Sequence, residues 1–441
     1  MTQPSKFSKR THFSRTAATT GVIAMGLITL AGCGTTSASA PTKSSSAVQD
    51  ITLWESHSSG GPAGQTMTAL VNQFNASHHS VHVQLVVTKA SHKALGALAA
   101  GDAPVLAEIS HYDGNFLTAH ALVSWNSLLS TLPSSETSAV FPVVWHNGEV
   151  NGQHYRIEAD AKVSQITYNK TLFAQAGITK PPTTWTQLAQ DAALIKAKDP
   201  GIIPIAWKDS SAHILPPFLS NGGNIFEPGS HDKRADFQTT AATATFNFFR
   251  SLYQKNELIF AHGTEIRADF GSGKLAMADG TSAGYQKILD AAGGKFPVGV
   301  FAYPSGSTGH SANLVQGLGF VLMTGHTHAQ DLAAAQFLDW WLKPSTQAYW
   351  GEHSGYPPVT TTGEAQIPSS FLASHPGLTV ANQILTSPYT ISRPIPTAYK
   401  EVQAVLDTAF FNAVTGRQSV AQALATLQKQ ADSYLSGQSA L

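Results

Sequence analysis

The chain has 441 residues, of which 42% are hydrophobic and only 12% are charged. Its 27 basic and 27 acidic side chains give a formal net charge of zero, and no basic tract is present, so nucleic-acid binding is disfavoured. The single cysteine excludes an intrachain disulfide.

The N-terminal segment is typical of a secretory signal. Four basic side chains precede the uncharged segment 21–31, which ends within Leu30-Ala31-Gly32-Cys33. An apolar run of about ten residues is too short to span a bilayer. The residues that follow are rich in Ser, Thr and Ala, which is the composition of a flexible linker. We therefore expect a signal peptide over residues 1–32 and a tether over residues 33–48.

The rest of the chain, roughly 390 residues, exceeds what one hydrophobic core usually organises, so two domains are expected. It opens with an apolar run at 51–54, which predicts a buried strand. Helical spacing of apolar residues over 67–74 and alternation over 81–85 indicate a helix and a second strand. A helix over 93–100 and a strand over 105–110 follow. This alternating order predicts an α/β fold with a parallel, helix-covered sheet.

Further along, strands are expected over 152–157 and 163–168. Thr184 and Gln187 have the spacing of a capping box that opens a helix. A strand over 275–277 and several helices follow, and the chain ends in two amphipathic helices. No internal repeat is visible.

Several short motifs occur in an order typical of one protein family. They are Leu53-Trp54, Phe74-Asn75-Ala76-Ser77, Ala99–Pro104, Tyr168-Asn169-Lys170, Ala176-Gly177-Ile178, Pro181–Trp185, Leu275–Gly280, Asn313–Phe320, Phe337–Trp341 and Gly355–Val359. Over roughly residues 50–436 the chain resembles the extracellular solute-binding proteins of ABC importers (family 1). It is most similar to the carbohydrate-binding group that includes the maltose- and glycerol-3-phosphate-binding proteins.

The resemblance implies a periplasmic-binding-protein type II fold, with two α/β lobes joined by hinge crossovers near Asp160 and Gly280. Lobe 1 would comprise residues 49–160 and 281–343. Lobe 2 would comprise residues 161–280 and 344–441. The ligand would bind in the cleft, and hinge closure would follow because ligand contacts on both lobes stabilise the closed form.

The resemblance also implies partners and a location. Leu30–Cys33 resembles the lipobox of bacterial lipoproteins, in which the cysteine is lipidated, so Cys33 would anchor the chain to the outer face of the cell membrane. The protein would be a monomer that delivers a sugar or oligosaccharide to the permease transmembrane subunits. No cofactor and no covalent chemistry are expected.

Sugar binding requires aromatic surfaces for CH faces and a few polar groups for hydroxyls. Motif matches and loop contexts give the expected ligand contacts: Trp54, Glu55, Tyr112, Asp113, Asp160, Trp207, Thr281, Ser282, Tyr285, Gly317, Tyr356 and Arg393. Four other tryptophans, at 185, 340, 341 and 350, lie on helix faces and are expected in the core.

A glycerol-3-phosphate or glycerophosphodiester ligand is the alternative within the same fold. A phosphate needs persistent positive charge, which Lys162, Arg393 and pocket histidines could supply. The chain departs from that type at two places. The glycerol-phosphate type has an aromatic residue where this chain has Lys89–His92, and it has an acidic residue near the position of His111. A peptide- or metal-binding relative is a weaker alternative.

Enzyme and metal functions have less support. Gly280-Thr281-Ser282-Ala283-Gly284 fits the nucleophile elbow of a serine hydrolase, with Ser282 as nucleophile, but no oxyanion glycine run accompanies it. Gly271–Leu275 lacks the full P-loop spacing. His78, His79 and His82 flank a strand and indicate a solvated edge, so no metal site is predicted.

Overall fold

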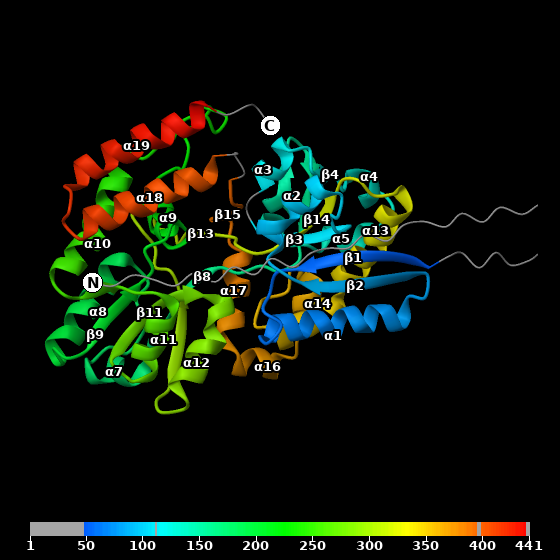
Figure 1. The fold of residues 1–441 in the computed structure, drawn as a ribbon. Coiled ribbons are helices and arrows are strands. Elements are labelled where there is room, and N and C mark those ends of the chain that lie inside the picture. Colours follow the sequence, from blue (N-terminus) through cyan, green and yellow to red (C-terminus); the bar gives the residue numbers. More distant parts are fainter. Residues whose placement is uncertain (1–47, 111–112, 395–397, 438–441) are drawn as a thin grey trace, which may run out of the picture. The chain divides into compact units, whose positions relative to one another are not determined.

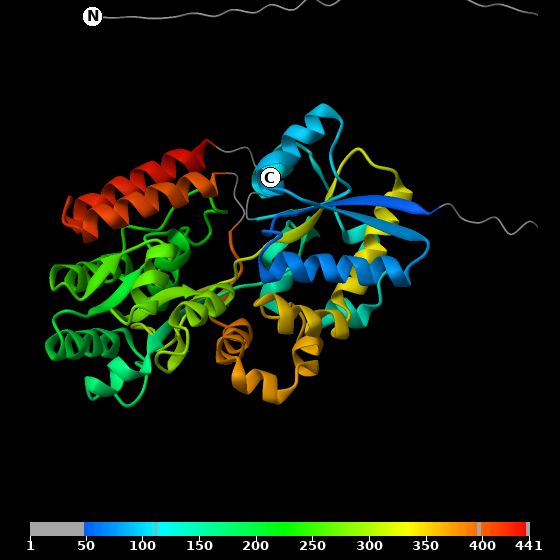
Figure 2. The ribbon, with the colours of Figure 1, turned by 60° about the horizontal axis from the view of Figure 1, so that its bottom comes forward.

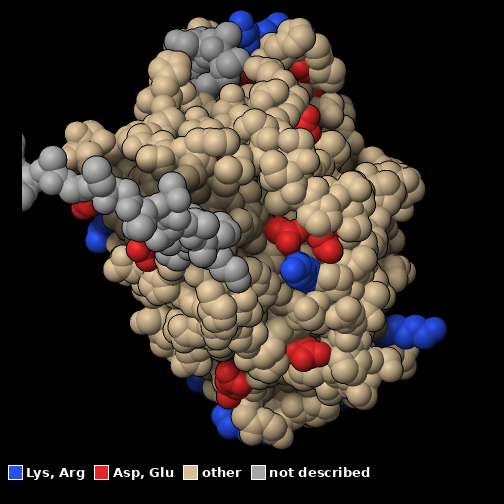
Figure 3. Space-filling view, turned by 90° about the vertical axis from the view of Figure 1, so that its right-hand side faces the viewer, with Lys and Arg blue, Asp and Glu red and all other residues tan. Residues whose placement is uncertain are grey.

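The computed structural model describes residues 48–110, 113–394 and 398–437, with the backbone alone for Asp113. The predicted signal peptide, nearly all of the tether and the lipidation site Cys33 lie outside these residues. Within the described part of the chain, no helix is long and apolar enough to cross a bilayer. Charged side chains are few and scattered on the face shown in Figure 3, as the composition leads one to expect.

The first sheet has the strand order β2-β1-β3-β14-β4, and β7 also pairs with β14. Strands β1, β2 and β3 are parallel, whereas β14 runs antiparallel to its partners. The strands are β1 (Gln49–Glu55), β2 (Val81–Val87), β3 (Leu106–Ile109), β4 (Leu122–Val123), β7 (Arg156–Glu158) and β14 (Gly319–Met323).

The second sheet has the order β10-β9-β11-β8-β12, in which β8 runs antiparallel to both of its neighbours. Its strands are β8 (Ser164–Asn169), β9 (Ile203–Trp207), β10 (Leu258–Phe260), β11 (Leu275–Thr281) and β12 (Val298–Ala302). Two short pairs complete the strands: β5 (Glu149–Val150) with β6 (Gln153–His154), and β13 (Asn313–Leu314) with β15 (Thr390–Ile391).

Helices surround both sheets, and the two C-terminal helices α18 and α19 lie side by side (Figures 1 and 2). The helices are α1 (Pro62–Ser77), α2 (Ala90–Ala100), α3 (Asp113–Thr118), α4 (Asn126–Leu129), α5 (Ser134–Ser138), α6 (Pro142–Trp145), α7 (Lys170–Gln175), α8 (Trp185–Lys198), α9 (Ser211–Ser220), α10 (Thr240–Gln254), α11 (Gly263–Gly271), α12 (Tyr285–Ala292), α13 (His328–Leu342), α14 (Pro344–Ser354), α15 (Thr361–Gln366), α16 (Ser369–Ser374), α17 (Pro376–Leu385), α18 (Tyr399–Val414) and α19 (Val420–Ser436). This arrangement confirms the predicted α/β fold with two sheets.

Each sheet has its own hydrophobic core. Trp341 and Trp350 are fully buried against the first sheet and Trp185 is buried against the second, as predicted, while Trp340 is half-buried beside the first core. The predicted helix start at Thr184 is also confirmed, since the Thr184 hydroxyl accepts a hydrogen bond from the Gln187 N–H at the start of α8.

The sheets correct the predicted lobe boundaries. Strand β12 pairs with β8, so residues 298–302 belong with the second sheet and not with lobe 1. Conversely, Trp350 of α14 and Ile384 of α17 lie in the core of the first sheet, although the predicted boundaries place both in lobe 2. The reason is physical: an apolar pattern predicts that a segment is buried, but not against which sheet.

The crossing between the sheets lies near Asp160, as predicted, but not near Gly280. Strand β11 continues through Gly280 to Thr281 within the second sheet. The chain returns instead at 315–318, where Lys162 and Gln316 form an antiparallel bridge and the Leu318 carbonyl accepts the Asp160 N–H. Residues 159–163 and 315–318 therefore run together as the hinge segments.

Gly317 is required at this hinge because there is no room for a side chain. A Cβ at position 317 would lie 2.3 Å from the Asp160 carbonyl oxygen. Gly317→Ala is expected to reduce the free energy of unfolding by about 1–3 kcal/mol, measured by urea denaturation. Gly96→Ala is the control, since a Cβ there meets nothing within 4 Å. Equal stability of the two variants would mean that the hinge can accept a side chain at position 317.

Candidate functional site

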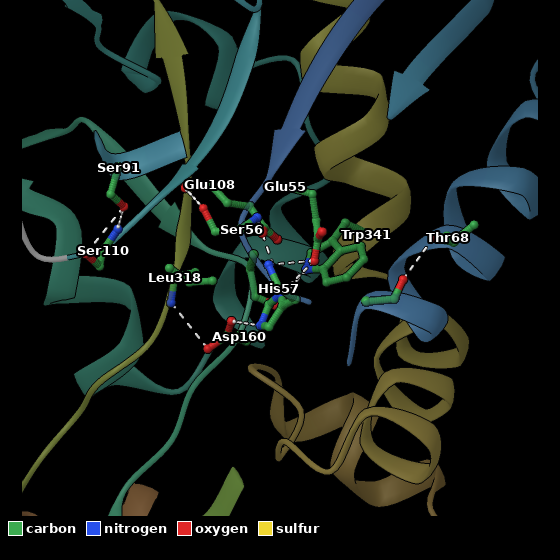
Figure 4. A network of polar contacts seen from close by, with 12 residues as sticks. Glu55, Ser56, His57, Thr68, Ser91, Glu108, Ser110, Asp160, Leu318 and Trp341 are labelled. Atoms are coloured by element: carbon green, nitrogen blue, oxygen red, sulfur yellow. Dashed lines mark hydrogen bonds and ion pairs between the residues drawn. The ribbon is translucent and has the colours of Figure 1, made fainter. Parts of the chain in front are cut away.

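Three acidic side chains from separate elements face one imidazole (Figure 4). Glu55 ends β1, Glu108 lies in β3, and Asp160 follows β7, while His57 lies in the loop after β1. Because β1 and β3 are parallel, their carboxyl ends meet at the same edge of the sheet, where ligands of such folds usually bind. All three acids are 0% exposed. We call these four residues the His57 cluster.

The imidazole lies close to each carboxyl group. His57 Nδ1 is 2.9 Å from Glu55 Oε1 and 3.5 Å from Glu108 Oε2, and His57 Nε2 is 3.1 Å from Asp160 Oδ2. Burial alone would lower the pKa of His57. The neighbouring carboxyl groups of Glu108, Asp160 and Glu55 together have a larger, opposite effect, so the pKa lies well above its usual value. Burial raises the pKa of Glu108, and His57 opposes that shift.

A cavity of about 620 Å³, here called cavity A, adjoins the His57 cluster. Segments that follow strands of both sheets contribute to it: His57, Gly60 and Gly61 follow β1, and Ser282 and Tyr285 follow β11. Tyr356 lines the same cavity, and its ring meets the His57 ring edge-on with centroids 5.3 Å apart. Burial raises the pKa of Tyr356 well above its usual value, so the hydroxyl remains protonated.

A second cavity of about 430 Å³, here called cavity B, is lined by the hinge residues Lys162 and Gly317 and by Arg393. The buried Arg393 side chain and Lys162 bring positive charge to this cavity, and the Arg393 backbone N–H donates to Asn147 Oδ1 over 2.7 Å. Burial lowers the pKa of Lys162, although Asp160 opposes the shift. Cavity B is therefore the more cationic of the two.

The predicted site residues divide into groups. Ser282, Tyr285 and Tyr356 line cavity A, and Gly317 and Arg393 line cavity B. Glu55 and Asp160 belong to the His57 cluster, are fully buried and line neither cavity. The structure thus brings these residues together, and their roles in ligand binding stay predictions.

The remaining predicted contacts lie elsewhere. Trp207 is 0% exposed in the core of the second sheet, with its ring centroid 5.1 Å from that of Tyr303, so it cannot touch a ligand without unpacking that core. Trp54 is half-buried against a small core beside α2, and Thr281 is partly buried at the end of β11. Tyr112 and the side chain of Asp113 lie outside the described residues.

Sequence reasoning missed His57 and Glu108. In the sequence, His57 has the pattern of an ordinary loop residue, and Glu108 lies within an apolar strand. The signal that could have found Glu108 is its charge, since a glutamate inside a buried strand is rarely tolerated without a partner.

The hydrolase alternative finds no support in the contacts of Ser282. Its Oγ accepts the Val163 N–H over 3.3 Å, and no described histidine or acid side chain is hydrogen-bonded to it. The triad geometry that activates a serine nucleophile requires such a partner.

Residues 69–379 match the family described as bacterial extracellular solute-binding protein. The chain belongs to this family. Members of the bacterial extracellular solute-binding protein family are binding proteins, which agrees with a cleft lined from two sheets. The sn-glycerol-3-phosphate-binding periplasmic protein UgpB of Pectobacterium atrosepticum is 24% identical over 426 residues, covering 88% of this chain and 92% of that protein.

Solved structures of other solute-binding proteins share the fold. The cyclic alpha-maltosyl-1,6-maltose binding protein from Arthrobacter globiformis has a TM-score of 0.77 at 21% identity, over 89% of this chain and 100% of that chain. UgpB from Mycobacterium tuberculosis, in complex with glycerophosphocholine, has a TM-score of 0.75 at 21% identity, over 88% of this chain and 98% of that chain. These likenesses confirm the two-lobed architecture.

The position of Trp207 predicts a stability effect. Trp207→Ala is expected to lower the free energy of unfolding by about 3–5 kcal/mol, because it opens a cavity in the second core. Urea denaturation measures this, and Tyr434→Ala, at a 45% exposed residue of α19, is the matched aromatic control. If W207A unfolded like Y434A, the assignment of Trp207 to the core would be wrong.

The carboxyl group of Asp407, which lines cavity B, should make the stability of the fold depend on pH. Burial raises the pKa of its carboxyl group from 3.8 to about 7, against an opposing hydrogen bond from the Ser211 backbone. Since the folded pKa exceeds the unfolded one, this group reduces stability as the pH rises from about 4 to 7. Asp407→Asn should remove that loss and be about 1–3 kcal/mol more stable than the unmodified chain at pH 8, but not at pH 4. Denaturation at both pH values tests this, with exposed Asp102→Asn as control.

Proposed function

We propose that this chain is the substrate-binding lipoprotein of an ABC importer, which binds a sugar or oligosaccharide between its two lobes and delivers it to the permease transmembrane subunits. The observation that supports this proposal is that cavity A is lined from both sheets. His57 and the loop after it come from the first sheet, and Ser282 and Tyr285 follow the second. A ligand there can contact both lobes and stabilise their closed arrangement.

The side chains of cavity A suit a carbohydrate. Tyr285, Tyr356 and Phe371 provide aromatic surface for the CH faces of a pyranose, and His57, Glu352 and Ser354 provide polar groups for its hydroxyls. The protein performs no covalent chemistry under this proposal. A fluorophosphonate probe should leave Ser282 unlabelled, and labelling there would favour a hydrolase instead.

The proposed location follows from the N-terminal sequence. Lipidation at Cys33 would hold the monomeric domain on the outer face of the cell membrane, at high effective concentration near its permease. Incorporation of radiolabelled palmitate into the native chain, and its loss in Cys33→Ser, would test the anchor.

A second candidate ligand is a glycerol phosphate or a glycerophosphodiester. Lys162 and Arg393 in cavity B favour it, because a phosphate needs fixed positive charge and hydrogen-bond donors. The relatives named for sn-glycerol-3-phosphate binding point in the same direction.

One experiment separates the two ligand classes. Isothermal titration of the purified protein with a panel of sugars and glycerol phosphates should identify the ligand. For a sugar in cavity A, Tyr356→Ala should weaken binding at least tenfold, about 1.4 kcal/mol, whereas Tyr356→Phe should retain most of the affinity.

For a phosphate in cavity B, Lys162→Gln should cause the larger loss and Y356A little. The exposed Lys180→Gln is the control for loss of a single positive charge. If no member of the panel bound, the proposed ligand classes would be wrong.

A further inference from the structure

The His57 cluster contains more negative charge than its histidine can balance. Glu55, Glu108 and Asp160 are all 0% exposed, and they surround a single imidazole. One proton on His57 compensates one carboxylate. Buried carboxylates are expensive unless they are paired, protonated or bound to a metal, so the excess requires an explanation.

One carboxylate oxygen of each glutamate in the cluster has no hydrogen-bond partner among the described residues. Backbone N–H groups satisfy one oxygen of each glutamate: His57 N–H donates to Glu55 Oε1 over 2.9 Å, and Ser56 N–H donates to Glu108 Oε2 over 3.0 Å. Glu55 Oε2 and Glu108 Oε1 are buried and unpartnered among the described residues. Buried acceptors without a partner require an explanation, and a bound water or ion is one such explanation.

The spacing of the donor atoms suits a metal ion. One oxygen of Glu55, one nitrogen of His57 and one oxygen of Glu108 all lie within 4.8 Å of one another. With metal–ligand bonds of about 2.0–2.2 Å, ligand atoms are separated by about 3–3.5 Å. His57 Nδ1 lies 2.9 Å from Glu55 Oε1 and 3.5 Å from Glu108 Oε2, the oxygens that also accept backbone N–H groups, and both distances are close to that range.

Asp160, the fourth member of the cluster, lies where it can orient the His57 ring. Asp160 Oδ2 lies 3.1 Å from His57 Nε2, on the far side of the ring from Nδ1. Metal-binding histidines commonly donate their second N–H to a carboxylate, which fixes the tautomer and directs the other nitrogen at the metal.

We propose that Glu55, His57 and Glu108 bind a divalent transition-metal ion, with Asp160 as the residue that orients His57. An imidazole with two carboxylates favours Zn²⁺ or Mn²⁺ over Ca²⁺ and Mg²⁺, which prefer oxygen ligands alone. His57 lines cavity A, which gives the ion an entry path. The proposal replaces the expectation of no metal site, and it does not depend on which solute binds.

The test uses the full chain, stripped with EDTA and then dialysed against Zn²⁺, Mn²⁺ or Co²⁺. Elemental analysis is expected to find one bound ion per chain, and Co²⁺ should give visible d–d absorption with nitrogen and oxygen ligands. Failure of the unmodified protein to retain any of the three ions would overturn the proposal, because protons alone would then balance the cluster.

Variants locate the ion. His57→Gln and Glu108→Gln should each weaken binding at least a hundredfold, and Asp160→Asn by about 10–100-fold with the Co²⁺ spectrum retained. The control is His146→Gln, at an exposed histidine 2.6 Å from Glu149 that could bind zinc adventitiously. Circular dichroism confirms that each variant folds. If H146Q, and not H57Q or E108Q, abolished binding, the ion would be adventitious and the proposal wrong.

Discussion

The pairing of the two hinge segments is the constraint on which the rest of the structure depends. Residues 159–163 and 315–318 are joined through the Lys162–Gln316 bridge and the bonds to the Leu318 carbonyl. Asp160 belongs both to this pairing and to the His57 cluster, and Lys162 and Gly317 line cavity B. A change in the angle between the sheets therefore alters both cavities, which is how a hinge couples ligand contacts to lobe closure.

The two cavities differ in chemistry although they share the hinge. Cavity A combines tyrosines with His57, whereas cavity B brings together Lys162 and Arg393. A neutral polyhydroxylated ligand would thus suit cavity A, and an anionic ligand would suit cavity B. The fold alone does not choose between them, because closely similar folds bind either kind of ligand.

What could be predicted from the sequence was mostly local. The cap at Thr184 depends on a residue three positions further on, and the burial of Trp341 depends on the face of one helix. The prediction that Trp207 lies at the cleft is wrong, because a tryptophan at a strand end has the same local pattern in a core as in a binding site. His57 was missed because two of its partners are 51 and 103 residues further along the chain, and no local pattern connects them.

The position of β14 has a consequence for how the chain acquires its fold. This strand, at residues 319–323, lies in the middle of the first sheet between β3 and β4, with the whole second sheet inserted before it in the sequence. The N-terminal sheet therefore cannot close until nearly three-quarters of the chain has been synthesised. Such long-range pairing slows folding and prolongs the time for which a chain stays open. If the signal predicted over residues 1–32 directs secretion, such late closure would keep the chain unfolded during export.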